Sequence, residues 1–130
     1  MEKIIFIELA EAIRIHNGQI EEHGGIYGVR DAQLLDSALN TPQASFSGQY
    51  LHKNLYEMAA AYAYHIIRNH PFLDGNKRTG ILLALIFLKI NGISKKFKQN
   101  ELYELSIKIA TSKISKKEIA QFFREKTVKN

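Results

Sequence analysis

The residues of this chain that could do chemistry are concentrated between His70 and Thr79, where the sequence reads HPFLDGNKRT. This segment combines a histidine, a carboxylate, a glycine turn and two cations. His70 is suited to take a proton from an acceptor hydroxyl, because imidazole changes its protonation state near neutral pH. The segment therefore predicts a site that transfers a phosphate-containing group, with His70 as its general base.

The second half of the segment leads into an apolar run, so residues 74–76 are expected to form a turn that feeds the N-terminus of a helix. Free backbone N–H groups and the helix dipole attract anions at such a position. Lys77 and Arg78 would be unfavourable in a first helical turn unless an anionic ligand is bound. Asp74 would repel a phosphate unless a magnesium ion bridges the two, so we assign Asp74 to Mg²⁺.

Each of these features alone has a common structural explanation. Histidine before proline is often structural, Asp-Gly-Asn is a frequent turn, and a Lys-Arg pair is usually solvated. Their combination in a fixed order, next to an apolar helical run, is far more specific than any single feature. The other histidines lack the spacing of a helical zinc site, so we interpret them as packing or surface residues: His16, His23, His52 and His65.

The segments before the site are predicted to be two helices and a long loop. Helical spacing of apolar residues begins at Phe6 and ends at the glycine pair 24–25, which predicts the first helix. Asp31 is expected to cap a second helix that closes at residues 40–42. Residues 41–54 have no helical period and exceed the length of a simple connector, so we expect a loop that has a function.

The segments that flank the site directly are also predicted to be helical. Apolar spacing from Leu55 predicts a third helix, which should end close to Asn69 because Pro71 disfavours the helical conformation at the residue before it. Residues 81–88 are apolar on every side, which predicts a central helix that is buried all round and ends at Asn91.

Two capping signals predict two further helices: Asn100, and a capping box of Ser115 with Glu118. The length of 130 residues, with 45% hydrophobic and 24% charged residues, fits one domain with one hydrophobic core. The sequence therefore predicts an all-α, compact single-domain bundle of about six helices over residues 1–130.

The composition also restricts the classes of protein. With no cysteine, disulfides and thiolate metal sites are excluded, so a bound metal needs oxygen or imidazole ligands. The longest apolar run, residues 81–88, is far shorter than the ~20 residues that cross a membrane. The N-terminus lacks the apolar core of a signal peptide, so we expect a cytoplasmic protein.

The net charge of +5 is unevenly distributed along the chain. Residues 1–40 carry three cations and seven anions, whereas residues 77–130 carry thirteen cations and four anions. A basic half can attract nucleic acid or an acidic protein, or it can simply be solvated. We favour a solvated lysine-rich face and expect no nucleic-acid partner.

The pattern His-Pro-Phe-x-Asp-Gly-Asn-Lys-Arg resembles the signature loop of the Fic/Doc superfamily, and specifically that of its Doc (death-on-curing) branch. The segment GVRD at residues 28–31, with the leucines and alanine that follow it and Pro42-Gln43, is similar to the segment that precedes the site in Doc-like proteins. The resemblance implies a compact helical fold that uses ATP and Mg²⁺ to modify a hydroxyl of another protein, usually as the toxin of a toxin-antitoxin pair.

The resemblance also implies a role for each residue of the loop. It makes His70 the base, Asp74 the Mg²⁺ ligand and Phe72 the anchor of the loop in the core. The remaining residues are implied to hold the phosphates of ATP: the Gly75 backbone and Asn76 by direct contact, and Lys77 and Arg78 as clamps.

Two positions depart from the wider Fic pattern in the way that Doc does. Lys77 stands where AMP-transferring members have a second glycine, and Ile81 stands where they have a second arginine. A lysine side chain fills the space that a glycine leaves open for the inner phosphates, so the resemblance implies a reversed ATP that presents its γ-phosphate. Phosphorylation of a protein Ser or Thr hydroxyl is then the expected reaction, with AMP transfer (AMPylation) as the alternative.

The resemblance further implies the partners of the protein. Elongation factor Tu is the implied substrate, translation arrest the implied effect, and a Phd-type antitoxin with an acidic, partly disordered segment the implied inhibitor. Residues 41–54 lie where we expect the flap of the family, an extended segment that holds a target chain by main-chain pairing; the alternative is a mobile surface loop. A non-catalytic basic helical module, which would bind RNA with steep salt dependence, is the alternative from another class.

Overall fold

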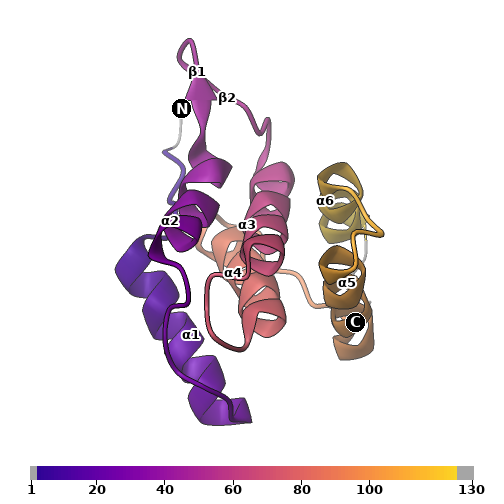
Figure 1. The fold of residues 1–130 in the computed structure, drawn as a ribbon. Coiled ribbons are helices and arrows are strands. Elements are labelled where there is room, and N and C mark those ends of the chain that lie inside the picture. Colours follow the sequence, from indigo (N-terminus) through magenta and orange to yellow (C-terminus); the bar gives the residue numbers. More distant parts are fainter. Residues whose placement is uncertain (1–2, 126–130) are drawn as a thin grey trace.

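Two helices of 15 residues each, α3 (Leu55–Asn69) and α4 (Asn76–Ile90), form the centre of the fold in the computed structural model, which describes residues 3–125 (Figure 1). Their close approach depends on Gly80. A Cβ atom at this position would lie 2.8 Å from Cγ1 of Ile67 and 3.2 Å from the carbonyl oxygen of Ala63. Because Gly80 has no side chain, the backbone of α4 can lie directly against α3. The loop that connects these two helices contains the signature segment.

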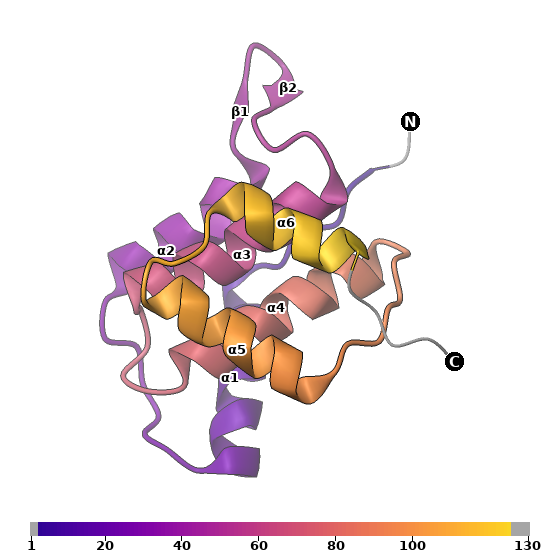
Figure 2. The ribbon, with the colours of Figure 1, turned by 90° about the vertical axis from the view of Figure 1, so that its right-hand side faces the viewer.

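The other helices cover this central pair on both sides. Helices α1 (Leu9–His23) and α2 (Ala32–Asn40) lie on one side, and α5 (Gln99–Ala110) and α6 (Lys116–Glu125) lie on the other (Figures 1 and 2). A 3₁₀ turn, η1 (Thr41–Gln43), leads into a hairpin of two short strands, β1 (Ser45–Phe46) and β2 (Gln49–Tyr50). The strands pair antiparallel, with Ser45 opposite Tyr50 and Phe46 opposite Gln49. The predicted all-α fold with six helices is confirmed.

Most of the predicted helix ends are confirmed by the capping contacts. The Asp31 side chain accepts a hydrogen bond from the Leu34 N–H at 3.0 Å, and Ser115 with Glu118 forms the predicted capping box. Helix α3 ends at Asn69, as its sequence pattern predicts.

Two predicted boundaries are wrong. Phe6 lies in an extended segment before α1, because Glu8 caps this helix through a reciprocal contact with Glu11. The Phe6 ring instead packs 5.6 Å from that of Tyr50 and 5.7 Å from that of Phe87. Asn100 does not cap α5, which begins at Gln99 after Lys98.

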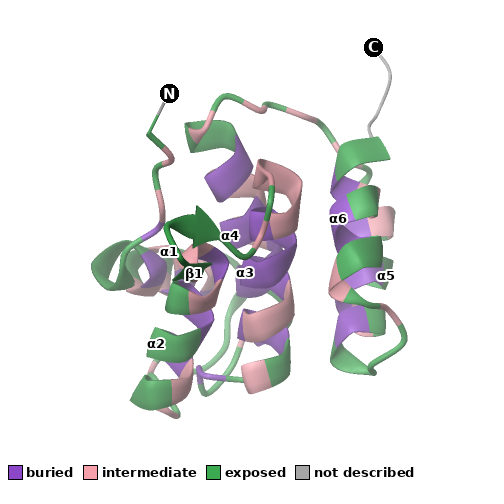
Figure 3. Cartoon of the chain, turned by 90° about the horizontal axis from the view of Figure 1, so that it is seen from above, coloured by how far each residue is buried: buried purple, intermediate pink, exposed green. Residues whose placement is uncertain are grey.

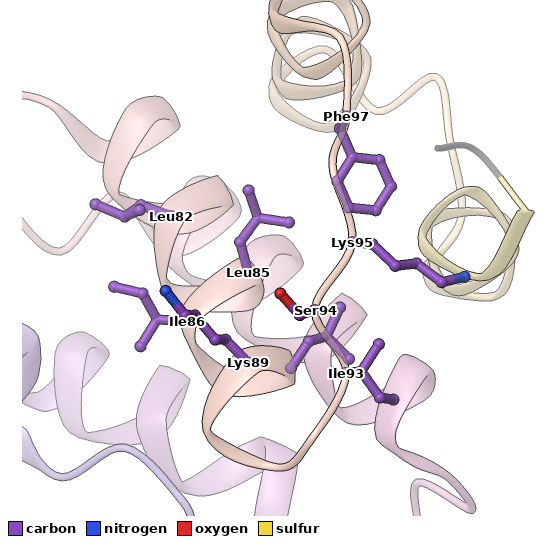
Figure 4. A pocket seen from close by; sticks show the side chains of 9 residues that line it. Leu82, Leu85, Ile86, Lys89, Ile93, Ser94, Lys95 and Phe97 are labelled. Atoms are coloured by element: carbon purple, nitrogen blue, oxygen red, sulfur yellow. The ribbon is translucent and has the colours of Figure 1, made fainter. Parts of the chain in front are cut away.

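Helix α4 is not buried all round, which corrects the prediction for residues 81–88. Leu83, Phe87 and Leu88 are buried, but the other face of the helix is half-buried. Leu82, Leu85 and Ile86 line a hollow of about 270 Å³ between α4 and the segment that leads to α5 (Figure 4). One face of this apolar run therefore lies in the core, and the other lies beneath the segment that connects α4 to α5.

The buried residues of the core lie mainly where the helices face one another, and many of them belong to α3 and α4 (Figure 3). Tyr62, Phe72, Phe87 and Phe123 are among the largest side chains that are fully buried. The Tyr62 hydroxyl accepts a hydrogen bond from the Ile7 N–H at 2.9 Å, while burial raises the pKa of Tyr62 to about 12. Within residues 3–125, no helix combines the length and apolar character needed to span a membrane.

A polar contact joins α6 to α3. Nε2 of His65 in α3 lies 3.1 Å from Nζ of Lys116, the first residue of α6. Burial, and then the charges of Lys116 and His52, lower the pKa of His65 from 6.5 to about 4. Between these values the unfolded chain binds more protons at this residue than the folded chain does.

We therefore expect acid to destabilise the fold through His65. The favourable contribution is fully present above pH 6.5 and is lost as the pH falls towards 4. Allowing for solvent around the half-buried ring, the free energy of unfolding should fall by about 2 kcal/mol over this range. Urea unfolding at a series of pH values measures the effect. His65→Gln, which stays neutral, should show a dependence flatter by that amount, and identical curves for the two proteins would contradict the assignment.

Candidate functional site

The candidate site begins where α3 ends, because His70 leaves the helix in a left-handed conformation (φ 55, ψ 51). Arg30 satisfies the carbonyl groups that the helix end leaves free. Its Nε donates to the His70 carbonyl oxygen at 2.6 Å, and its terminal nitrogen donates to the Asn69 carbonyl oxygen at 2.9 Å. The backbone of His70 is thus fixed from two sides, while its imidazole is exposed.

The segment before α2 lies alongside the signature loop and pairs with its backbone. The Arg30 N–H donates to the Pro71 carbonyl oxygen at 2.7 Å, and the Leu73 N–H donates to the Gly28 carbonyl oxygen at 3.0 Å. Between these bonds, Val29 and Phe72 form an antiparallel bridge. This pairing gives a structural reason why residues 28–31, together with the loop, resemble the Doc-like proteins.

Phe72 fixes the loop in the core and is stacked on a histidine that the sequence analysis interpreted as a packing or surface residue. The rings of Phe72 and His16 are 3.8 Å apart and nearly parallel, at 4°. His16 is 1% exposed, and its Nε2 donates a hydrogen bond to the Asp74 carbonyl oxygen at 2.7 Å. The signal for this residue is in the sequence, because Ala12, His16 and Ile20 follow each other at the spacing of a buried helical face.

Asn76 holds the loop from the other side, through its side chain. Its Oδ1 accepts a hydrogen bond from the Phe72 N–H at 2.9 Å, and its Nδ2 donates to the Phe72 carbonyl oxygen at 3.0 Å. The residue is 2% exposed. The amide therefore closes the loop on itself, and the phosphate contact implied for Asn76 stays a prediction that rests on its backbone N–H.

Asp74 lies at the surface with its carboxylate oriented by two backbone groups. Oδ1 accepts from the Gly75 N–H at 2.9 Å, and Oδ2 accepts from the Ile26 N–H at 3.2 Å. Gly25 makes the second contact possible, because its φ is +127 and a Cβ there would lie 2.8 Å from Oδ2. Each carboxylate oxygen keeps a free lone pair, so Asp74 can still bind a cation.

Gly25→Ala should therefore disturb the site although no residue of the loop itself is replaced. The added methyl group displaces the Asp74 carboxylate, and the backbone conformation is strained for any residue but glycine. We expect a loss of stability of about 1–2 kcal/mol and weaker binding of divalent cations, measured by thermal unfolding and by titration with Mg²⁺. Gly24→Ala is the matched control, because a Cβ at Gly24 meets nothing within 4 Å although its φ is also positive.

The first turn of α4 places two exposed cations at the positive end of a helix dipole. Gly75 precedes this helix in a left-handed conformation, with no side-chain cap, and the first turn contains no acidic residue. Lys77 and Arg78 are exposed. Among residues 3–125, the ion pair found within 4 Å joins Glu22 and His23. Within this range, Lys77 and Arg78 therefore have no carboxylate partner. The free N–H groups of the first turn and both side chains can bind an anion.

These groups share one cleft of about 640 Å³. His70, Asp74 and residues 75–78 form one wall of it, whereas Phe72 lies beneath in the core. The end of α1 and one face of α5 form the rest: Gln19, Glu22, His23, Gln99, Leu102, Tyr103 and Ser106, with Ile81, Leu82 and Leu85 of α4. The cleft thus combines a basic anion-binding end with an apolar and aromatic wall, which suits a nucleotide.

The hairpin predicted to act as a flap lies away from this cleft. It precedes the N-terminus of α3, whereas His70 follows its C-terminus (Figures 1 and 2). The 15 residues of α3 separate the two ends by about 22 Å. The expectation that residues 41–54 hold a target chain at the site is therefore wrong for this structure. The exposed apolar side chains near His70 belong instead to the segment that pairs with the loop: Ile26, Tyr27, Val29 and Leu73.

Comparisons with known proteins agree with this geometry. Residues 6–88 match the sequence profile of the Fic/DOC family. A protein named protein kinase doc, from Escherichia phage P1, is 33% identical over 114 residues, which cover 88% of this chain and 89% of that protein. A protein named toxin Doc, from Mycolicibacterium smegmatis, is 46% identical over 70 residues, which cover 54% of each chain. The match extends from the first helix through α4 and includes the whole signature loop, so this chain belongs to the Fic/DOC family.

Proposed function

We propose that the protein is a Doc-like toxin that transfers the γ-phosphate of ATP to a Ser or Thr hydroxyl of a protein. One observation carries the proposal: the exposed imidazole of His70 lies in the same cleft as two exposed cations at the N-terminus of α4, which have no carboxylate partner among residues 3–125. A base and an anion site next to each other are the two parts that phosphoryl transfer to a hydroxyl needs. The name of the phage P1 relative supports a kinase rather than another transferase.

The residues of the cleft fit ATP and Mg²⁺. The phosphates would be held by the N–H groups at the start of α4 and by the side chains of Lys77 and Arg78. Asp74 would hold Mg²⁺. No cluster of three or more His, Cys, Asp or Glu is present among residues 3–125, so the other ligands would be phosphate oxygens and water, as is common for this ion. Bound there, Mg²⁺ would neutralise charge on the phosphates.

In the proposed reaction, His70 takes the proton of the acceptor hydroxyl. The hydroxyl oxygen then forms a bond to the γ-phosphorus, the bond to the β-phosphate oxygen breaks, and ADP leaves. Arg30 holds the His70 backbone, which fixes the point from which the side chain extends into the cleft. Catalysis would come mainly from positioning and from the positive charge around the transferred group.

Lys77 favours phosphate transfer over AMP transfer in this proposal. Its side chain occupies the first turn of α4, where a glycine would leave the backbone open to the inner phosphates. This supports an ATP that presents its γ-phosphate to His70. A cleft of about 640 Å³ is large enough for either orientation of ATP. The experiment must therefore distinguish phosphate transfer from AMP transfer.

The test compares transfer of label from γ-labelled and α-labelled ATP to purified elongation factor Tu, with intact-mass analysis of the product. We expect a phosphoryl increment from the γ-labelled nucleotide and none when His70 is replaced. An adenylyl increment would contradict the proposed orientation. If elongation factor Tu stays unmodified, the same assay on a cell lysate tests other proteins, and the absence of any ATP-dependent label there would contradict the enzymatic function.

The proposal includes an antitoxin as the natural inhibitor, because both named relatives are Doc proteins and one is called a toxin. A Phd-type partner with an acidic segment would be attracted by the basic half of the chain, residues 77–130. Translation arrest would follow from modification of the elongation factor. Growth of a host with and without induced expression of the chain tests the toxicity.

A further inference from the structure

Lys116 stands out among the side chains that the proposed reaction does not use. It is half-buried at the start of α6, and its Nζ lies 3.1 Å from His65 Nε2 and 5.6 Å from the centroid of the Tyr64 ring. An ammonium group can only donate, so His65 must accept this bond as a neutral imidazole. The amine thus already has a proton acceptor within hydrogen-bond distance.

A second histidine adds to this cluster. His52, which follows the hairpin, has a buried Nδ1 without a hydrogen-bond partner. Burial, and then the charge of Lys116, lower the pKa of His52, while Glu57 has the opposite, smaller influence. Three groups that can carry positive charge, from the hairpin connection, α3 and α6, therefore lie close enough to influence one another's pKa.

The carboxylates near this cluster are engaged elsewhere. Glu118 accepts hydrogen bonds from the N–H and hydroxyl groups of Ser115, and Glu57 accepts from the Lys53 N–H and the Asn54 side chain. Lys116 is also the first residue of a helix, where the dipole disfavours a cation. Burial lowers the pKa of its ammonium group. Burial and the helix dipole both increase the fraction of neutral, nucleophilic amine.

We propose that Lys116 is an acylation site for small activated acyl donors, that is, acyl phosphates or acyl thioesters, with His65 as the proton acceptor. Nζ forms a bond to the acyl carbonyl carbon, and the bond from this carbon to the phosphate oxygen or thiol sulfur breaks. The leaving group departs with the electron pair, and the amine proton passes through His65 Nε2 to water. The product is an amide that carries no charge.

Acylation would change the contact between His65 of α3 and Lys116 of α6. It removes the charge that disfavours protonation of both histidines, and it replaces the donor to His65 by a larger amide. The pKa of His65 should therefore rise, which can be followed through its imidazole resonances. A rise in this pKa is specific to Lys116, because modification of an exposed lysine elsewhere leaves the cluster unchanged.

The experiment incubates the full chain with acetyl phosphate, and in parallel with acetyl-coenzyme A, at pH 7 and pH 10. Peptide mass spectrometry then gives the acetylated fraction at Lys116 and at Lys117, an exposed neighbour that serves as internal control. We expect at least about threefold more acetyl at Lys116 than at Lys117 at pH 7, and a ratio closer to one at pH 10, because the lowered pKa of Lys116 gives a smaller advantage as the pH rises.

Equal or lower labelling of Lys116 at pH 7 with both donors would overturn the proposal, whereas preferential labelling by either donor supports it and identifies the donor class. His65→Phe tests the role of the acceptor: the ratio at pH 7 should fall towards one in a variant that stays folded by circular dichroism. An unchanged ratio would overturn the role of His65. The comparison of the two lysines in the unmodified sequence does not depend on the folding of any variant.

Discussion

Replacing His70 by alanine or asparagine is expected to lower the rate of phosphoryl transfer about 10²- to 10⁴-fold, because the acceptor hydroxyl loses its base. The imidazole is exposed, and the contacts that fix this residue run through its backbone. The rate with saturating ATP and protein acceptor, measured from label transfer, checks the prediction.

The two variants differ in what they do to the fold. His70 has a φ of 55, so alanine should cost about 1 kcal/mol of stability, while asparagine tolerates this conformation. His70→Asn therefore separates the chemistry from the backbone. If His70→Asn keeps the full rate, His70 is not the base, and the proposed mechanism is wrong even if ATP is consumed.

The fold was largely predictable because its determinants are local. Asp31 and the Ser115–Glu118 pair cap their helices through side chains three residues apart, and Pro71 ends α3 by a steric effect on the residue before it. One error is local, because Lys98 and not Asn100 precedes the first residue of α5. The other errors concern contacts between separate segments. The position of Phe6 depends on rings from the hairpin and from α4, and the half-buried face of α4 depends on a segment more than five residues further along the chain.

The same distinction applies to the site. The signature loop could be recognised because its reactive residues are consecutive in the sequence. The helical spacing indicates that His16 is buried, but the contacts of His16 and Arg30 with the loop could not be predicted, since each residue lies 40 or more residues from the loop atom that it binds. The hairpin shows the opposite error: it is close to α3 in sequence, but the length of this helix separates it from His70. The spacing of apolar residues predicts which helix a residue belongs to. It does not predict which distant residues lie beside it in the fold.

Asn76 offers the second test of how the loop is built. In Asn76→Ala, the N–H and carbonyl groups of Phe72 lose their partners in a buried position. A buried unpaired polar group costs about 1–3 kcal/mol, so we expect a loss of about 2–4 kcal/mol in the free energy of unfolding. The rate of transfer should fall as well, because Phe72 links His70 to the turn at Asp74. Urea unfolding and the transfer assay measure the two effects.

Lys77→Ala is the matched control, one residue further along the same helical turn. Lys77 is exposed and lacks a hydrogen-bond partner among the described residues, so its removal should change stability by less than about 0.5 kcal/mol. It should weaken ATP binding by roughly tenfold, since a charge-assisted contact to phosphate is lost. If Asn76→Ala instead weakens ATP binding with little loss of stability, the Asn76 side chain binds phosphate directly. The hydrogen bonds to Phe72 would then have to open when ATP binds, because the same amide cannot remain buried against Phe72 and reach a ligand in the cleft.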